Sequence, residues 1–533
     1  MVQPGIVWTM TREWFVKILK AVAVAILLFL LLFAESLRGS SYTAIGSVLR
    51  EITAVLQDSE TQWMLFVSLG IYFTAFLFFR YRASPGFWRA ANPHLWLACA
   101  LVIVAVLYAI DYVPSTQALT LLGGAVLGQG MGFWARLEMQ NVHHVERGKK
   151  FTIQNSLVLL VVSILVILLA GAPVLHAGFS RTFEYHSQAR WSSVWDNPNI
   201  FGLLMGTGVL IALGLTVASF RLLSGRIGKW SCALLCLLAA ILMRRGLLHS
   251  YSRGAWLATV CGGVYLLWHW MNREMPSVAE PQEETNWPQE IAALPSGTKG
   301  IEPRISRIAR MANSPSLIRV IREIRGKKCW LLLSVVLSSA VILAFWHFRG
   351  TDWHPARRAF SSVNAADFSW RNRIAAWEGA LQITADHPLF GAAWGQPEPL
   401  YGHYYLPPKL NETGAIELND YLMLVATNGI PALFCFGMYI WLALKRKVES
   451  GKHPPSRSLR QTGKTEIQDA DWLKSVCYSG AIVLLVGFWF DGGLFKLPTA
   501  ATFWILLELG AAEPSQPHAQ TDSPDTKSHE DVS

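Results

Sequence analysis

Two arginine positions stand out in a largely apolar chain. Arg253 lies in the sequence Ser-Arg-Gly-Ala-Trp (252–256), directly before a charge-free stretch, and Arg373 lies in a polar segment together with Arg371. An arginine side chain stays charged and presents a planar fork of donors that matches two phosphate oxygens. Two such forks can hold a diphosphate and stabilise the charge that develops on it as a leaving group. The residue types therefore predict that Arg253 and Arg373 bind a diphosphate.

Other polar residues stand at the borders of similar charge-free stretches. Asp-Asn-Pro-Asn (196–199) precedes one of them and Asn-Asp-Tyr (419–421) precedes another. The first turn of a helix carries free N–H groups and partial positive charge, so these segments favour the same anion. The candidate substrate-binding residues are Asn197, Asn199, Ser252, Arg371, His387 and Asn419. No Cys/His spacing typical of a zinc site occurs, so we expect no metal.

Each of these features also has a purely structural interpretation. Asp-Asn-Pro-Asn is a good helix cap, and Arg253 is long enough to reach the membrane interface from a buried position. His387 stands before Pro388 and can simply mark the end of a helix. Arg244 and Arg245 suit a surface role. The functional interpretation depends on whether these features lie on one side of a membrane.

The composition predicts an integral membrane protein. The chain has 533 residues, of which 52% are hydrophobic and 15% charged, with a mean hydropathy of +0.32. Soluble proteins carry about 25% charged residues, so an ordinary soluble enzyme is excluded. A helix needs about 20 apolar residues to cross a bilayer. Twelve segments qualify, the last three of this list less clearly: 61–79, 90–110, 112–135, 151–180, 197–220, 254–272, 329–348, 421–444, 475–490, 17–35, 230–243 and 497–507.

The distribution of positive charge predicts the orientation. With the N-terminus inside, 32 of the 46 Lys and Arg residues fall on the inner side. Basic residues are retained in cytoplasmic loops, so both termini are expected inside. The net charge of +10 then sets the topology and does not indicate binding to nucleic acid. In this orientation the arginines and polar segments described above all lie on the outer side, where ionisable residues at membrane depth indicate function.

The predicted fold class is all-α, with about twelve transmembrane helices and a long, partly helical extracytoplasmic loop. Residues 349–418 form this loop, and a helix is expected in its Arg-Asn-Arg segment, with a stripe of Ile374, Trp377, Ala380, Leu381 and Ile383 that ends at Asp-His-Pro (386–388). The predicted organisation comprises 1–271 with helices one to eight, 272–328 as a basic cytoplasmic linker, 329–348 as helix nine, the loop 349–418, 419–510 with helices ten to twelve, and a disordered cytoplasmic tail 511–533.

The order of these motifs resembles the O-antigen ligase and polymerase superfamily of bacterial membrane glycosyltransferases. The motifs are Asn-Pro-Asn (197–199), Ser-Arg-Gly-Ala-Trp (252–256), Arg-x3-Trp (373–377), His-Pro-Leu-x-Gly (387–391), and Asn-Asp-Tyr-Leu (419–422) followed by Asn-Gly-Ile-Pro-Ala-Leu (428–433). The resemblance covers roughly residues 190–445. It implies a twelve-helix enzyme of the bacterial inner membrane, with its active site facing the periplasm.

The same resemblance implies the reaction. Such enzymes transfer a glycan from an undecaprenyl-diphosphate-linked donor to lipid A core, a growing polysaccharide or a protein, without a metal, cofactor or nucleotide sugar. The partners implied are this donor, the glycan, lipid or protein acceptor and the lipid bilayer, with no nucleic acid. The family arginines that contact the donor diphosphate correspond to Arg253 and Arg373.

One position departs from the family pattern. The family commonly has a histidine directly before Asn-Asp-Tyr as the candidate base, and this chain has Leu418. A carboxylate or imidazole can replace it, so Glu417 and Asp420 join the two arginines as candidate catalytic residues, with His387 and His403 as further possibilities. The alternatives left open are a polymerase rather than a ligase, a lipid-linked glycan transporter, and a non-catalytic membrane scaffold.

Overall fold

The computed structural model describes residues 18–33, 93–111, 116–145, 156–179, 183–185, 188–223, 225–274, 368–394, 396–410, 412–450 and 464–511. The predicted spans 61–79 and 329–348 lie outside these residues, as do most of the linker 272–328, the first part of the loop 349–418 and nearly all of the tail 511–533. The described residues are mostly helical. One antiparallel hairpin, β1 (Phe183–Tyr185) and β2 (Gln188–Arg190), is the exception.

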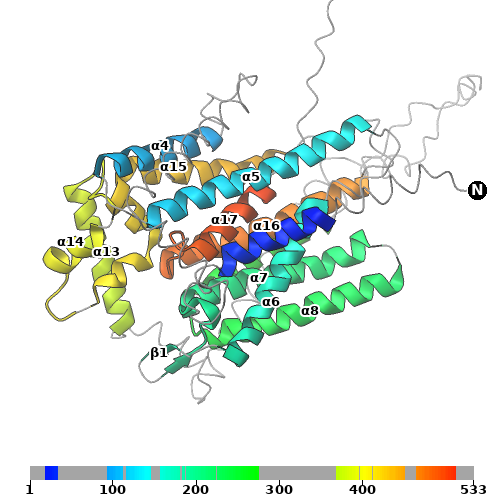
Figure 1. The fold of residues 1–533 in the computed structure, drawn as a ribbon, viewed down its shortest axis with the longest axis horizontal. Helices are drawn as coiled ribbons and strands as arrows, with labels where there is room; N and C mark the ends of the chain where they lie inside the picture. The colour runs from blue at the N-terminus through cyan, green and yellow to red at the C-terminus, as the bar shows by residue number, and fades with distance from the viewer. Residues whose placement is uncertain are drawn as a thin grey trace, which may run out of the picture. The chain divides into compact units, whose positions relative to one another are not determined.

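Long helices make up most of the described residues (Figure 1). They are α4 (Pro93–Asp111), α5 (Thr116–Val145), α6 (Ser156–Phe179), α7 (Pro198–Leu222), α8 (Arg226–His249), α9 (Arg253–Glu274), α13 (Phe368–Asp386), α15 (Asp420–Ser450), α16 (Lys464–Phe490) and α17 (Leu497–Gly510). Shorter elements are α14 (Pro397–Leu400), the 3-10 turns Ser193–Trp195 and Thr413–Leu418, and the π-turn Tyr401–Tyr405.

Six helices in the described part of the chain are long and apolar enough to cross a membrane. They are Gln117–Ala135, Leu157–His176, Pro198–Phe220, Arg226–His249, Asp420–Lys445 and Asp471–Phe490, and shorter apolar helices occur at Ile18–Phe33, Pro93–Val104 and Leu497–Gly510. The protein is therefore a multi-pass membrane protein. The total of twelve spans and the orientation stay predictions.

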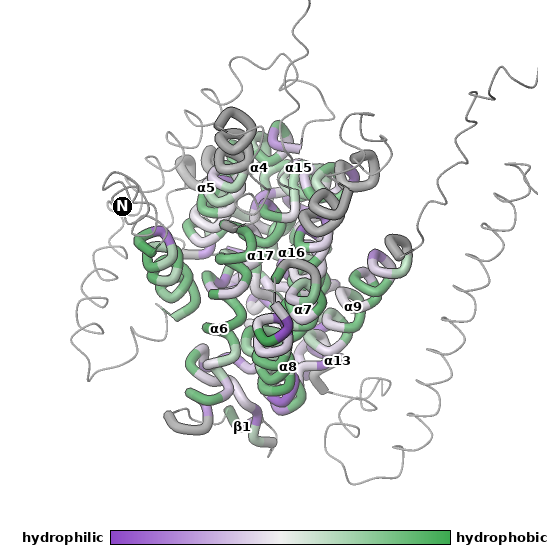
Figure 2. Tube along the Cα trace, turned by 90° about the vertical axis from the view of Figure 1, so that its right-hand side faces the viewer, coloured by the Kyte–Doolittle hydropathy of each residue, from purple (hydrophilic) through white to green (hydrophobic). Residues whose placement is uncertain are grey.

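Helix α8 shows how the predicted spans differ from the helices. The charge-free stretch 230–243 predicted a short span, but α8 extends through the basic residues at both of its ends to a length of 24 residues. Between its basic ends, most of its exposed side chains are apolar, among them Ile227, Leu234, Leu235 and Ile241. Figure 2 shows this apolar character along α8 and the other long helices. An exposed apolar face of this length is suited to contact with lipid.

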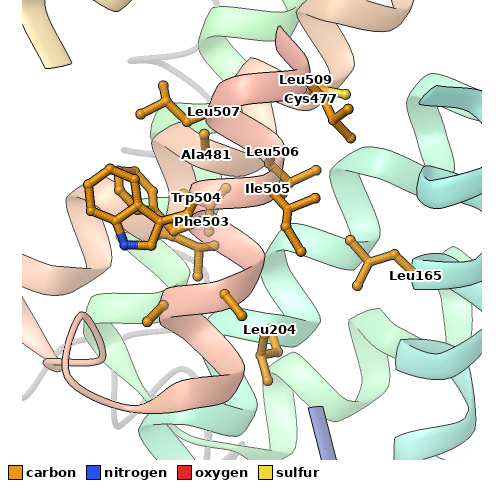
Figure 3. Close-up of a cluster of buried hydrophobic side chains, with 14 of the residues drawn as sticks. Leu165, Leu204, Cys477, Ala481, Phe503, Trp504, Ile505, Leu506, Leu507 and Leu509 are labelled. Atoms are coloured by element: carbon orange, nitrogen blue, oxygen red, sulfur yellow. The ribbon is translucent and has the colours of Figure 1, made fainter. Parts of the chain in front are cut away.

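Helix α17 lies at the centre of the core. Every residue from Pro498 to Gly510 is buried, which is typical of a helix that is apolar on all sides. Figure 3 shows its side chains among Leu165 of α6, Leu204 of α7 and Cys477 of α16. Helix α5 approaches it closely, since a Cβ added to Gly124 or Gly128 would lie within 2.8 Å of Trp504 atoms. The apolar helices thus form one packed core that supports the N-terminal ends of α7, α9 and α15 and the C-terminal end of α16.

The polar segment around Arg371 and Arg373 forms α13, as predicted, and α13 ends at Asp386. The predicted stripe was partly wrong, because Ile374 and Leu381 are exposed. The buried face consists of Asn372, Ala376, Ala380 and Ile383. Small residues are needed on this face because Tyr401 packs directly against the α13 backbone, and a Cβ added to Gly379 would lie 2.4 Å from its ring.

Helix α15 is broken in its N-terminal part. Gly429 has φ 80° and ψ 173°, so Asp420–Ser450 consists of two helices joined at a kink, with Pro431 following. The loop after α13 satisfies the freed backbone groups. Ile430 N donates to Pro388 O at 2.8 Å, and Ala392 N donates to Ala426 O at 2.7 Å. The His-Pro-Leu-x-Gly and Asn-Gly-Ile-Pro segments therefore interlock, and their hydrogen bonds satisfy backbone groups at the helix break.

Candidate active site

The first turn of α9 is built around Ser252. Its hydroxyl oxygen accepts a hydrogen bond from Ala255 N at 3.1 Å, which caps the helix. The same hydroxyl donates to the carboxylate of Asp491. Ser252 is buried and Arg253, the next residue, is half-buried. The predicted segment therefore opens α9, with Arg253 in the first helical turn.

Asp491 joins this turn to α13. It lies directly after α16, is buried, and accepts an ion-paired hydrogen bond from Arg373 Nη2 at 3.2 Å. The Arg373 side chain keeps 13% of its surface exposed, so it can still meet a ligand. A Cβ on Gly254 would lie 2.5 Å from Asp491 Oδ2, so only glycine allows α9 to approach this carboxylate. Ser252 and Arg373, which are 121 positions apart in the chain, thus meet on one carboxylate.

Asp491 is a site residue that the sequence interpretation missed. It stands in Asp-Gly-Gly (491–493), which reads as an ordinary end of a span. The available signal was its predicted place in the short outer loop 491–496 between two spans, in which Asp491 is the only carboxylate residue. A buried carboxylate needs a partner, and a basic residue on the same side was the expected one.

The start of α15 lies against the same turn. Asn419 Oδ1 accepts hydrogen bonds from Tyr421 N and Leu422 N, both at 3.1 Å, so Asn419 caps α15. The buried carboxylate of Asp420 accepts from Leu494 N at 2.7 Å. A Cβ on Gly492 would lie 2.8 Å from Glu417 O and 3.7 Å from Leu418 Cα. The position at which the family has its histidine is therefore beside the Asp491 turn.

The Glu417 side chain is half-buried and accepts a hydrogen bond from Gln117 Nε2 at 2.9 Å. Gln117 lies in the first turn of α5. This bond fixes the direction of the carboxylate without burying it completely. Glu417 is consequently better placed than Asp420 to exchange a proton with a ligand.

The segment Asn197–Asn199 is bound to the α8–α9 turn by Arg190, a second residue that the sequence interpretation missed. Asn197 Oδ1 accepts from Asn199 N at 2.9 Å, which is the capping geometry of the structural interpretation. Asn199 Oδ1 accepts from Arg190 Nη2, and Arg190 Nε donates to Ser250 O, both at 2.8 Å. Arg190 is buried and belongs to no recognisable motif, so no pattern in the sequence singled it out.

The other predicted residues lie farther from Asp491. Arg371 is exposed, and His387 and His403 are exposed beyond the end of α13. Asp386, at that end, is thirteen residues from Arg373, which is about 20 Å along an α-helix. The structure therefore brings together Ser252, Arg373 and the first turn of α15, but it does not bring His387 to Arg373.

Aromatic rings flank the Arg373 side of the site. Trp377, one turn after Arg373, contacts Trp489 with ring centroids 5.9 Å apart, and Tyr421 contacts Trp489 at the same distance. The arrangement places a partly exposed arginine next to large apolar rings, which suits a ligand with a charged group and an apolar part. Among the described residues, no group of three His, Cys, Asp or Glu side chains is placed to hold a metal ion.

Comparison with known proteins relates the part of this site that comes from α13 and the start of α15 to a family. Residues 308–437 match the family described as O-antigen ligase. The match includes α13, α14 and the first part of α15, with Arg373, Glu417 and Asp420, whereas Arg253 and Asp491 lie outside it. No curated protein matches the chain. Residues 308–437 are therefore an O-antigen ligase domain within a multi-pass membrane protein, and this family indicates glycan transfer with lipid-linked substrates.

Proposed function

We propose that the protein transfers a glycan from an undecaprenyl-diphosphate-linked donor to an acceptor at the outer face of the bacterial inner membrane, in O-antigen or exopolysaccharide assembly. The acceptor is lipid A core, a growing polysaccharide or a protein. The observation that carries this proposal is the Ser252–Asp491–Arg373 connection. It holds a partly exposed arginine of the O-antigen ligase domain beside the first turn of α9, which carries Arg253.

In the proposed reaction, Arg253 and Arg373 bind the donor diphosphate. The acceptor hydroxyl oxygen attacks the anomeric carbon of the donor sugar, and the bond from that carbon to the phosphate oxygen breaks. The diphosphate leaves with the electron pair, and the arginines together with the N-terminus of α9 stabilise its charge. Glu417 takes the proton of the acceptor hydroxyl. Asp420, buried and bonded to Leu494 N, positions the Asp491 turn rather than exchanging a proton.

The proposal includes the orientation of the chain. Twelve spans with both termini inside place the starts of α7, α9 and α15 on the periplasmic side. The domain boundaries 1–271, 272–328, 329–348, 349–418, 419–510 and 511–533 belong to the same proposal. Cysteine labelling from either side of the membrane tests it, with single cysteines at Asp196 for the periplasmic side and at Arg226 for the cytoplasmic side.

The arginine pair is tested by transfer from a purified undecaprenyl-diphosphate glycan to candidate acceptors. Arg253→Ala and Arg373→Ala should each abolish transfer at normal expression. Arg373→Lys keeps the charge but loses the planar fork, so an intermediate loss is expected. Arg226→Ala, an exposed arginine at the other end of α8, is the matched control. Full activity in either alanine variant would exclude the diphosphate clamp.

The proton acceptor requires a separate comparison. Glu417→Gln keeps the size and the bond to Gln117 but removes the base, so kcat should fall by about a hundredfold or more while KM for the donor changes little. Glu412→Gln, in the same outer segment, is the control. Chelator should leave the rate unchanged under the metal-independent mechanism. Release of unchanged donor across the membrane without transfer to any acceptor would instead support a transporter.

A further inference from the structure

A second polar and aromatic surface lies at the far end of α13 from Arg373. The π-turn Tyr401–Tyr405 has the sequence Tyr-Gly-His-Tyr-Tyr and directly follows α14, next to α13 (Figure 1). Insertions of this kind are frequent at functional sites because they redirect a few side chains. Here the turn presents His403 and Tyr404 to the outside, and Tyr404 is 77% exposed.

The turn is rigidly held. Tyr401 is completely buried among Ala376, Ala380 and Ile383 of α13, and Leu406 N donates to Tyr401 O at 2.8 Å. Tyr405 OH donates to the carboxylate of Asp386. This bond raises the pKa of Tyr405 above its ordinary value, so the phenol stays protonated. A large ring such as Tyr404 that is exposed on a fixed turn loses little conformational freedom when a ligand covers it.

The rings of His403, Tyr404 and Tyr405 form a short row, of which Tyr405 is half-buried. The ring centroids of His403 and Tyr404 lie 6.3 Å apart, and those of Tyr404 and Tyr405 lie 6.4 Å apart. Asp386, exposed at the end of α13, adds a carboxylate at one end of this row. A saccharide offers apolar C–H faces to aromatic rings and hydroxyl donors to a carboxylate, so it matches both features.

We propose that this surface, formed by Asp386, His403, Tyr404 and Tyr405 and called here the tyrosine face, binds the saccharide chain of a lipid-linked substrate. The inference rests on the proposed function, since it assumes that a glycan reaches this side of the domain. The carboxylate of Asp386 disfavours the anionic lipid headgroups that are the other candidate for exposed tyrosines. The saccharide belongs either to the donor or to a glycan acceptor.

The position of the tyrosine face predicts a dependence on chain length. Its carboxylate is about 20 Å along α13 from Arg373, so a sugar next to the diphosphate cannot reach both. Only a chain of several sugars spans this distance. The tyrosine face should therefore contribute to the binding of long glycans and leave single repeat units unaffected.

The first experiment measures transfer with donors and acceptors that carry one or many repeat units. Tyr404→Ala should raise KM about tenfold for the long substrate only, with kcat unchanged, because truncation of one well-placed aromatic side chain costs roughly this factor. Lengthening the donor and the acceptor separately shows which of them is bound. Tyr404→Phe should behave like the wild type, and Trp230→Ala, an exposed aromatic residue at the other end of the bundle, is the control. Equal KM changes at all lengths would overturn the proposal.

A binding experiment separates this proposal from the proposed reaction. Free repeat-unit oligosaccharide is titrated against the full-length Arg373→Ala protein in nanodiscs, which needs no turnover. Saccharide binding that His403→Ala and Tyr404→Ala weaken by about tenfold supports the tyrosine face even if no transfer is found. Binding that neither variant changes overturns it even if transfer is normal. A change only in fluorescence quenching by brominated lipids would identify a membrane anchor and also overturn it.

Discussion

Arg373 of α13 and Ser252, which caps α9, are held on the two oxygens of one buried carboxylate, that of Asp491. Arg373 Nη2 lies 3.2 Å from Oδ1, and the Ser252 hydroxyl donates to Oδ2. The carboxylate therefore determines the separation between the first turn of α9 and the arginine of the O-antigen ligase domain. It also offsets one of the two positive charges that we propose to face the diphosphate.

The first prediction is that Asp491 is needed for transfer without contacting substrate. Hydrogen bonds to charged groups contribute about 1.5–3 kcal/mol, and each 1.4 kcal/mol is a tenfold change. Asp491→Ala should lower kcat/KM by about a hundredfold. Asp491→Asn keeps the shape but loses the charge, so a loss of about tenfold is expected. Asp196→Asn, an exposed carboxylate near the start of α7, is the control. Unchanged transfer by Asp491→Ala would show that Arg373 is positioned by other contacts.

The second prediction concerns the space between α9 and Asp491. Gly254→Ala would bring a methyl group to 2.5 Å from Oδ2 and 2.7 Å from Phe490 Cβ, so the carboxylate must move. Overpacking of this kind costs about 1–3 kcal/mol, and it should reduce transfer about tenfold or more. Gly263→Ala lies on the same helix, where the nearest atom would be 3.7 Å away, and should transfer normally. Similar rates in the two variants would mean that the approach of α9 is not critical.

The third prediction tests the interlock at the break of α15. Gly429 has φ 80°, and a Cβ there would lie 2.2 Å from Leu389 O. A left-handed conformation costs a residue with a Cβ about 1–2 kcal/mol even without a clash. Gly429→Ala should therefore lower Tm in detergent and weaken the contact with the loop 388–393. Gly437→Ala, in the same helix with open space around it, should leave Tm equal or higher. A straightened and equally stable α15 in Gly429→Ala would contradict the interlock.

The fourth prediction concerns pH at the tyrosine face. The hydrogen bond to Asp386 raises the pKa of Tyr405, and a raised tyrosine pKa means that the folded state favours the protonated phenol. The stability from this bond is thus complete below the ordinary tyrosine pKa of about 10 and is lost as pH rises through the raised value. Asp386→Asn should move the pKa of Tyr405 downwards. NMR of tyrosine labelled at the ζ carbon measures it, with Tyr405→Phe to assign the signal. An unchanged pKa in Asp386→Asn would show that the bond is not formed.

The sequence predicted the parts of this molecule that depend on local patterns. The long apolar stretches within the described residues form helices, and α13 ends at Asp-His-Pro as expected. Both features depend on residues that are close together in the sequence, so a local pattern is enough to predict them. Counting spans predicted the polar motifs on one side, and the starts of α9 and α15 do lie at the Asp491 turn, whereas the side of the membrane stays a prediction. Ser252 and Arg373 do meet, but through Asp491, a residue whose neighbours in the sequence suggested only a turn.

What the sequence could not supply were contacts between distant segments. Arg190, in strand β2, donates hydrogen bonds to Asn199 and to the carbonyl of Ser250. The pattern of hydrophobic residues did not predict the hairpin to which β2 belongs. The break of α15 was hidden inside a span because its freed N–H and C=O groups are satisfied by the loop after α13, 40 positions earlier. The buried face of α13 was predicted partly wrongly because the ring of Tyr401 packs against this helix, so the residues facing it must be small. Each of these depends on tertiary partners, which overrule local preference.

The last prediction concerns the one carboxylate in α17. Glu508 is buried, and its Oε1 accepts hydrogen bonds from Gln129 Nε2 of α5 at 2.5 Å and from Tyr439 OH of α15. It therefore ties three helices together within the core. Glu508→Ala leaves two buried donors without an acceptor, at about 1–3 kcal/mol each, so Tm in detergent should fall clearly. Glu508→Gln keeps a carbonyl oxygen for both donors and should stay close to the wild type.

Removal of one donor provides the intermediate case. Tyr439→Phe leaves Glu508 bound to Gln129, so its Tm should lie between those of Glu508→Ala and the wild type. The site around Asp491 is built from other residues, so transfer per folded molecule should be equal in all three variants. If Glu508→Gln were as unstable as Glu508→Ala, the negative charge rather than the acceptor oxygen would hold the helices. Hydrogen bonds between helices in a bilayer contribute on average less than about 1 kcal/mol in some proteins. An equal Tm in all variants would mean that the hydrogen bonds of Glu508 are equally weak and do not hold the three helices together.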